Sequence, residues 1–437
     1  MPLPVRSLVG FCLCVVLLSL PAGCKSVEEQ ADDSEAQAQS GPASVQPEFV
    51  APRASVRTVQ LYSGSDEQSL PVVTLNGNDA LTLEFDLMVD EGRPLSIYFE
   101  HADRTWTRDL SPSQILRSYQ DDRLFEYQSS RGTEVPYVHY EYRFPNEDIR
   151  FRVSGNYILR VTERGRRDSV LFEQPFFVTE EKGGLRLGGE RLNIPGQRAP
   201  SLRPIARFTP PAEIQGDPFG HTVCFVRNGR LNEPRCEDRP VLAQQPELEF
   251  ELGRDRAYAP LAAGYEVDLS TLRASSEIAE VDRTRSPFRV VLDADYARFG
   301  EGAARARNGN GQPVVRGALS DQLDPAVSAE YVETTFAFVP AEQRPYGSPL
   351  TVGGSFQGMD PSRGTRMEWN STRTQYEGSV LLKQGVYEYF YSTSDPALTE
   401  QIRATQPRIS GSYTAFVYYR DARRNTDRLL QVNRFSP

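Results

Sequence analysis

The sequence has few of the residue types on which most catalytic and metal-binding sites depend. It contains three histidines, His101, His139 and His221, and no two of them have the spacing of paired metal ligands. The 437 residues also contain no Gly-x-Ser-x-Gly elbow, Ser-x-x-Lys pair, phosphate-binding glycine loop or dinucleotide fingerprint. We therefore expect no catalytic residues, no metal site and no cofactor, and we predict that the protein is not an enzyme.

Lysine is also scarce, and most of the basic charge comes from arginine. The three lysines are Lys25, Lys182 and Lys383, and the formal net charge is −10 with a pI near 5.2. Because an acidic surface repels a phosphate backbone, we expect no nucleic-acid partner. In so acidic a chain, the neighbouring carboxylates Asp121 and Asp122, and Asp293 and Asp295, are expected to be solvated and not to form the acid pair of a hydrolase.

The sequence lacks an apolar run long enough to span a bilayer. The run from Leu8 to Leu20 covers 13 positions, short of the roughly 20 that a transmembrane helix needs. Arg6 precedes this run, and the small-residue stretch 21–23 follows it. This layout is typical of a signal peptide, so we predict that residues 1–23 direct export and are then removed.

Cys24 directly follows the small residues, which is where lipoprotein processing acylates a cysteine. Two acyl chains are enough for stable anchoring, and we therefore predict a lipid anchor to the membrane at Cys24. Ordinary signal cleavage near Ala22 is the alternative, because Leu20 lies four residues before the cysteine instead of the usual three. Residues 24–53 are rich in Glu, Asp, Gln, Ala and Ser, a composition that predicts a disordered tether.

Two of the five cysteines are left for a disulfide in the exported chain. Cys12 and Cys14 lie in the signal segment and Cys24 is assigned to the lipid, so Cys224 and Cys236 form a possible pair in an oxidising compartment. Such a bond would stabilise the fold by about 3 kcal/mol. Two buried free thiols are the alternative.

Residues 54–181 show the patterns of a first β-sandwich. Apolar and polar residues alternate over 81–87, which indicates a half-buried strand, and similar short runs recur between turn residues. Six or seven such strands in one segment are typical of a sandwich. The order Ser111, Pro112, Gln114 adds one short helix, with serine as its cap and proline at its first position.

The rest of the chain contains two further β-rich segments. We expect a second domain over 185–300, a linker over 301–324 and a C-terminal β-sandwich over 325–437. A Gly-x-Tyr pattern recurs at Gly155, Gly385 and Gly411, a spacing typical of the tyrosine corner of sandwich domains. The predicted fold class is therefore all-β, with three consecutive immunoglobulin-like or β-sandwich domains.

Two long motifs in the first domain carry a family resemblance. The stretches HADRTWTRDLSPS, from His101 to Ser113, and HYEYRFPNEDIRFRVSGNYILRV, from His139 to Val161, resemble the first domain of the type IX secretion system plug protein family. The resemblance continues through NGR at 228–230, DLSTLR at 268–273 and VLLKQGVYEYFY at 380–391. It therefore extends over most of the chain that would follow the signal peptide.

The resemblance implies a location and a task. Members of this family are β-rich proteins at the periplasmic face of the outer membrane in Bacteroidetes-like lineages. They are thought to associate with a very large outer-membrane β-barrel translocon and to occlude the periplasmic end of its pore. By this resemblance, the partner is the translocon and the function is steric, so an active site is not needed.

We expect structural roles for the motif residues. Trp106 is expected to pack in the first sandwich beside the short helix, and Asn146 and Asp148 to shape a turn through side-chain to backbone hydrogen bonds. The full set is His101, Asp103, Trp106, Leu110, Ser111, Pro112, Pro145, Asn146, Asp148, Gly155, Asn156 and Tyr157.

One alternative function also comes from a resemblance. Residues 354–391 resemble the glycogen-binding modules of the immunoglobulin-like class, which bind sugars on exposed aromatic residues. Gln357 follows Phe356 where many plug relatives have an aromatic residue, and Trp369 is the one tryptophan in this segment. An envelope carbohydrate-binding lipoprotein is therefore the weaker alternative.

Overall fold

The computed structural model describes residues 48–437 except 118–120, 196, 198, 232, 245, 298–310, 321, 405, 407 and 410. The expected signal peptide, Cys24, most of the expected tether and part of the expected linker lie outside the described residues. Within the described part of the chain, no helix is both long enough and apolar enough to cross a membrane.

The first domain consists of two sheets that face each other across an apolar core, and all their strand pairs are antiparallel except that of β2 with β9. The core-facing side chains of β3, such as Leu81, Leu83 and Phe85, are fully buried, as their alternation predicts. The first sheet has the order β1 (Val56–Ser63), β3 (Leu81–Leu87), β7 (Val138–Phe144) and β6 (Tyr127–Ser129). The second has the order β2 (Val72–Thr74), β9 (Val170–Thr179), β8 (Gly155–Glu163), β4 (Leu95–Ala102) and β5 (Asp121–Leu124), with helix α1 (Pro112–Ile115) beside it.

The second domain is built from two sheets, and one of them includes the last two strands of the chain. One sheet has the order β10 (Gly184–Leu192), β11 (Ser201–Thr209), β15 (Glu247–Glu251) and β14 (Val241–Gln244). The other has the order β13 (Arg235–Glu237), β12 (His221–Arg227), β29 (Tyr413–Asp421) and β30 (Thr426–Phe435). Three short 3₁₀ helices lie between these strands: η1 (Ala212–Ile214), η2 (Pro218–Gly220) and η3 (Arg254–Arg256).

The third domain lies between these two parts of the second domain in the sequence. One sheet has the order β17 (Tyr265–Asp268), β27 (Gly385–Thr393), β23 (Leu350–Gly354) and β24 (Thr365–Arg366), with β21 (Val314–Val315) also on β27. The other has the order β18 (Ile278–Asp282), β19 (Arg289–Leu292), β22 (Tyr331–Val339), β26 (Gln375–Lys383) and β25 (Glu368–Asn370), with β20 (Asp295–Tyr296) on β22. The helices are α2 (Pro325–Ser328), η4 (Ser355–Gln357), η5 (Pro361–Arg363) and α3 (Pro396–Ile402).

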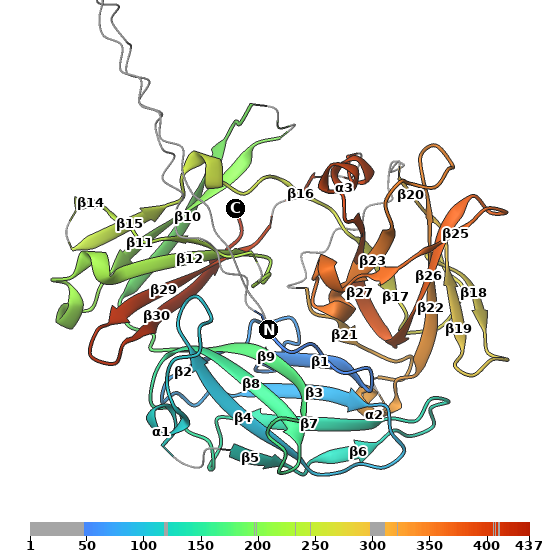
Figure 1. Ribbon diagram of the computed structural model, residues 1–437, viewed down its shortest axis with the longest axis horizontal. Coiled ribbons are helices and arrows are strands. Elements are labelled where there is room, and N and C mark those ends of the chain that lie inside the picture. The colour runs from blue at the N-terminus through green and yellow to red at the C-terminus, as the bar shows by residue number, and fades with distance from the viewer. Residues whose placement is uncertain are drawn as a thin grey trace, which may run out of the picture. The chain divides into compact units, whose positions relative to one another are not determined.

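This strand pairing differs from the consecutive division that the sequence patterns suggested. The red strands β29 and β30 in Figure 1 lie beside the green β12, and residues 221–227 of β12 pair with residues 413–419 of β29. Strands β17 to β20, expected in the second domain, pair with strands of the third. The short strands β16 (Leu261–Ala262) and β28 (Arg408–Ile409) pair where the chain passes between these domains.

The all-β prediction is confirmed, and two tyrosine corners help to hold the sandwiches. The Tyr157 hydroxyl donates a hydrogen bond to the Val153 carbonyl oxygen at 2.6 Å, and the Tyr387 hydroxyl does the same to the Lys383 carbonyl oxygen at 2.6 Å. Each bond reaches back four residues and ties the start of a strand to the loop or strand before it.

Candidate functional site: the interfaces and edges of the first domain

The motif residues around His101 lie where the first domain meets the hairpin of β29 and β30. His101 is fully buried, with its Nδ1 2.7 Å from Asp109 Oδ1 and its Nε2 3.2 Å from the Ser154 carbonyl oxygen. The other oxygen of Asp109 accepts a hydrogen bond from the Thr426 hydroxyl of the hairpin. Burial alone would raise the pKa of Asp109, but the hydrogen bonds from His101 and Thr426 lower it.

Gly155 and Asn156 bring the first domain and the hairpin into close contact. The side-chain oxygen of Asn156 accepts a hydrogen bond from the Tyr418 hydroxyl at 2.8 Å. Gly155 has a φ of 144°, and a Cβ at this position would lie 2.4 Å from His101 Nε2 and 3.0 Å from the Asp427 carbonyl oxygen. Only glycine therefore fits between the two elements without a shift of one of them.

Two ion pairs complete this contact. Asp427 is 1% exposed, and it accepts hydrogen bonds from the Arg104 backbone N–H at 3.1 Å and from its guanidinium group at 3.0 Å. Glu180 accepts two hydrogen bonds of 2.7 Å from Arg428. Burial alone would raise the pKa of Glu180, but Arg428 lowers it.

We call the following residues the hairpin joint: His101, Arg104, Asp109, Gly155, Asn156 and Glu180 of the first domain, and Tyr418, Thr426, Asp427 and Arg428 of the hairpin.

Trp106 lies beside the hairpin joint, in a small apolar cluster between the first and second domains. Its ring contacts the Phe177 ring edge-on at a centroid distance of 5.5 Å, and Phe177 packs against Phe416 of β29 at 4.5 Å. The Cys224–Cys236 disulfide belongs to the same cluster. The sequence analysis expected Trp106 to pack inside the first sandwich beside the short helix. Instead, Trp106 packs on Phe177, whose side chain lies outside the first core, in the cluster between the two domains.

Four other motif residues shape the region around α1. The Ser111 backbone N–H donates to Gln114 Oε1 at 2.9 Å, Pro112 is the first residue of the helix, and Leu110 packs against the first core. Asp103 holds the preceding loop, because its Oδ1 accepts hydrogen bonds from backbone N–H groups further along the loop. These contacts fix the loop that carries the joint residues.

The FPNED segment forms the turn after β7. Asn146 Oδ1 accepts hydrogen bonds from the backbone N–H groups of Asp148 at 2.9 Å and Ile149 at 2.8 Å. The preceding peptide bond, between Phe144 and Pro145, is cis. This is the kind of side-chain to backbone bonding that the sequence suggested for Asn146.

A second interface joins the first and third domains at Lys383. Its Nζ lies 2.7 Å from Asp86 Oδ2 and 2.6 Å from the Ala326 carbonyl oxygen, and 4.3 Å from the centroid of the Tyr137 ring. The side chains of Lys383 and Asp86 are both 1% exposed. Burial alone would raise the pKa of Asp86, but Lys383 and His139 lower it.

Asp86 is also held by two further side chains. His139 Nδ1 lies 2.8 Å from its Oδ1, and the Tyr331 hydroxyl donates to its Oδ2 at 2.7 Å. A buried charge is tolerated when hydrogen bonds and an opposite charge compensate for lost hydration, and both are present here. We call Asp86, His139, Tyr331 and Lys383 the lysine junction.

The first domain also has an open groove at the ends of its two sheets. Strand β5 is the last strand of one sheet and β6 the last strand of the other, and Phe125 and Glu126 connect them. The groove has a volume of about 890 Å³. We call it the edge groove, and its wall includes Asp121, Phe125, Glu126, Glu141, Arg143 and Asp148.

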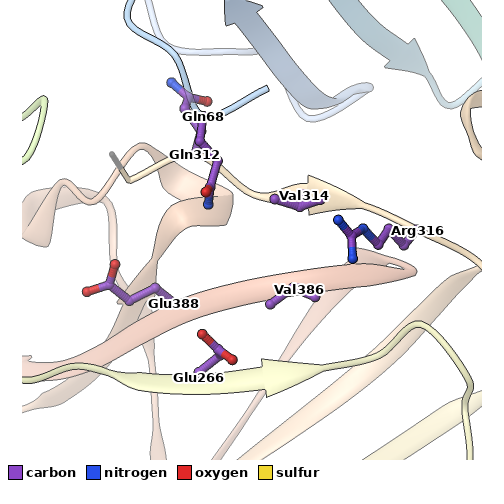
Figure 2. Close-up of a pocket in the computed structure, with 7 residues that line it drawn as sticks. All are labelled: Gln68, Glu266, Gln312, Val314, Arg316, Val386 and Glu388. Atoms are coloured by element: carbon purple, nitrogen blue, oxygen red, sulfur yellow. The ribbon is translucent and has the colours of Figure 1, made fainter. Parts of the chain in front are cut away.

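A smaller cavity, of about 110 Å³, lies beside β27 and β17. Figure 2 shows Glu388 of β27, Glu266 of β17 and Arg316 around it, with Gln68 of the first domain at its far side. Burial raises the pKa of Glu388 to about 7, and the charge of Arg230 opposes that rise. Among the described residues, no group of His, Cys, Asp and Glu side chains could hold a metal ion.

The acidic pair and the tryptophan considered for alternative functions are engaged in packing. Asp295 is half-buried and accepts hydrogen bonds of 2.8 Å from the hydroxyls of both Tyr389 and Tyr391. Trp369 packs edge-on against Tyr376 at a centroid distance of 5.1 Å and against the third core.

The sequence reasoning missed the lysine junction and most hairpin residues of the joint. Asp86 belongs to the polar set of an alternating strand, which normally faces water, whereas here the third domain covers that face. A usable signal was present in Lys383, a rare lysine in an arginine-rich chain that directly follows the apolar residues 380–382 at the end of its strand.

Comparisons with known proteins agree with this architecture. Residues 56–180 match the family model described as the type 9 secretion system plug protein 1st domain. No curated protein matches the sequence. A solved structure of a hypothetical protein from Parabacteroides merdae ATCC 43184 aligns with a TM-score of 0.77 and 21% identity, over 90% of this chain and all of that chain, and it shows the fold alone. An alignment with the Salmonella alpha-2-macroglobulin mutant Y1175G has 10% identity over 88% of this chain and 23% of that one, with a TM-score of 0.17 that supports no argument. By this match, residues 56–180 of the chain are a first domain of the type 9 secretion system plug protein family.

Proposed function

We propose that this chain is a non-enzymatic component of the type IX secretion system that binds the large outer-membrane barrel translocon and occludes its periplasmic end. The single observation that carries the proposal is the family match over residues 56–180. A protein that closes a wide pore must fill space and keep its shape, and it needs no nucleophile.

The interfaces of the first domain support this proposal. The hairpin joint ties the first domain to β29 and β30 through buried hydrogen bonds and two ion pairs. The lysine junction ties the first domain to the third. Contacts of this kind make domains move together, which is the property that a steric plug requires. The motif residues thus support rigidity in place of catalysis.

Affinity purification from detergent-solubilised outer membranes tests the proposal. The tagged chain is expected to recover a very large β-barrel protein, and deletion of its gene is expected to make the envelope permeable to large antibiotics. If the chain is recovered alone and permeability does not change, the proposal is wrong.

The proposed location is the periplasmic face of the outer membrane, with a lipid on Cys24 as the anchor. Diacylation would keep the chain close to its partner and raise the local concentration at the pore. Mass spectrometry of the mature N-terminus tests the anchor, because a diacylated Cys24 and a chain cleaved near Ala22 differ in mass. We do not propose sugar binding, since Trp369 packs against Tyr376.

A further inference from the structure

Strand β5 and the end of β7 that extends beyond its pairing with β6 line the edge groove, and no strand among the described residues pairs with the outer edge of β5. The outer edge of a terminal strand carries backbone N–H and C=O groups that no neighbouring strand satisfies. Strand β5 pairs with β4 on its other side. The free edge of β5 can accept an additional extended strand.

The side chains of the edge groove favour a basic ligand. Its wall carries five carboxylates against two guanidinium groups, and Arg143 is already paired with Glu141 at 2.8 Å. Asp121, Glu126 and Asp148 form no ion pair with any residue that the structure describes. A groove of this kind is electrostatically complementary to arginine or lysine side chains.

An exposed aromatic group adds an apolar contact beside these charges. Phe125 is 52% exposed and lies in the wall of the groove, and Tyr127, the first residue of β6, is 37% exposed. An extended strand presents alternate side chains to opposite faces. A ligand can therefore direct basic residues at the carboxylates and apolar residues at Phe125.

We propose that the edge groove binds an extended, arginine- or lysine-rich segment of a partner protein, which adds as a strand along β5. This inference rests on the proposed function and deepens it, since it assigns the surface and the chemistry of the partner segment. Backbone hydrogen bonds to the free edge would provide affinity, and the carboxylates would select for basic side chains.

Charge argues against occupants from this chain. The segment 25–47 contains five acidic residues and one basic residue, so the carboxylates of the edge groove would repel it. A second copy of the chain, with a formal net charge of −10, is likewise a poor match. A separate basic segment fits the groove best.

Binding of a labelled synthetic peptide to the full exported chain tests the inference. The probe is a peptide of about six residues, a usual strand length, in which arginine alternates with valine. A second peptide has proline in place of each valine, so it keeps the charge but loses the backbone N–H groups at those positions. Fluorescence anisotropy should show that the chain binds the first peptide at least about tenfold more tightly than the second.

Two triple variants locate the binding site. The variant D121N/E126Q/D148N removes three carboxylates of the edge groove and should weaken binding of the arginine–valine peptide by about tenfold or more. The matched control E280Q/E342Q/E368Q removes three exposed carboxylates of the third domain and should leave the affinity unchanged. Circular dichroism of both variants checks that they fold. The variant F125S removes the exposed aromatic ring without a change of charge, and it should also weaken binding of the arginine–valine peptide.

Each result either supports or overturns the inference. Equal affinity for both peptides, equal weakening by both triple variants, or no binding by the wild type would overturn it. Self-association that is abolished by D121N/E126Q/D148N would show that a second copy occupies the groove, which also overturns it.

A parallel translocon pull-down separates this inference from the proposed function. If the wild type does not recover the barrel, the proposed function fails whatever the peptide does. If the wild type and D121N/E126Q/D148N recover it equally, the proposed function stands and the assignment of the edge groove fails.

Discussion

Replacement of Lys383 by methionine should destabilise the protein strongly. Methionine has a similar length but no charge, so the variant removes the 2.7 Å contact with Asp86 and leaves that carboxylate buried. His139 and Tyr331 would still contact Asp86, but its charge would have lost its nearest cationic partner. The loss of one partner from a buried ion pair is far more costly than the absence of both.

The structure sets the size of the expected effect. Breaking a fully buried ion pair typically costs about 3 to 5 kcal/mol, and both groups here are 1% exposed. The lost bond from Lys383 to the Ala326 carbonyl oxygen and the lost cation–π contact with Tyr137 act in the same direction. We therefore expect K383M to lower the free energy of unfolding by about 4 kcal/mol.

Urea unfolding followed by tryptophan fluorescence measures this change. Trp106 reports on the interface of the first and second domains and Trp369 on the third domain, so the signal follows the unfolding of all three. The control is K182M, whose ammonium group is 48% exposed and lies 3.4 Å from Glu180. Because Lys182 is half-exposed and Glu180 keeps both hydrogen bonds from Arg428, loss of this pair is expected to cost about 0 to 1 kcal/mol, so K182M should unfold close to the wild type.

A double variant tests the reason for the effect. In K383M/D86N no uncompensated charge is left in the junction, so the double variant should be more stable than K383M alone. The two substitutions are then coupled by more than about 1 kcal/mol. Two results would contradict this account of the lysine junction. One is a free energy of unfolding for K383M that equals that of K182M, and the other is a double variant whose loss of stability is the sum of the losses of K383M and D86N.

Three further predictions follow from other contacts. G155A should lower the free energy of unfolding by about 2 kcal/mol or more, because its Cβ would overlap His101, whereas G188A, where space is open, should change it by much less. Burial raises the pKa of Asp295 to about 7, so its contribution to stability is present below an ordinary aspartate pKa and lost as the pH rises through 7. Denaturation at pH 5 and pH 8 should show a smaller loss in D295N than in the wild type, with Glu388 responsible for part of the remainder, and an undiminished loss would contradict the prediction. Reduction of the Cys224–Cys236 disulfide should cost about 3 kcal/mol in the same assay, and an unchanged midpoint would contradict this.

The alternation of side chains made much of the first domain predictable. In β3 each second residue is apolar and fully buried, so the pattern alone identifies the strand and its core face. The cap of α1 and the turn at Asn146 were predictable for the same reason, because neighbouring residues determine them. Features set by local sequence can be read from the sequence.

Features set by distant contacts could not be predicted in this way. An alternating pattern indicates a strand but not its partner, so the pairing of β12 with β29 left no local signal. Asp86 has the pattern of a solvated residue, and only the contact with Lys383 shows that its face is covered. The edge groove, likewise, exists because β5 and β6 end two different sheets on the same side of the first domain.

The pairing of β12 with β29 also has a consequence for the order of folding. Synthesis from the N-terminus produces β12 long before β29, so the second sandwich stays incomplete while the whole third domain emerges. Because contacts between distant segments form slowly, closure of this sandwich is expected to be a late step. A chain interrupted before β29 would leave both the sheet of β12 and the Asn156 side chain without their partners, so partial products would be open to proteases and only full-length molecules would become stably folded.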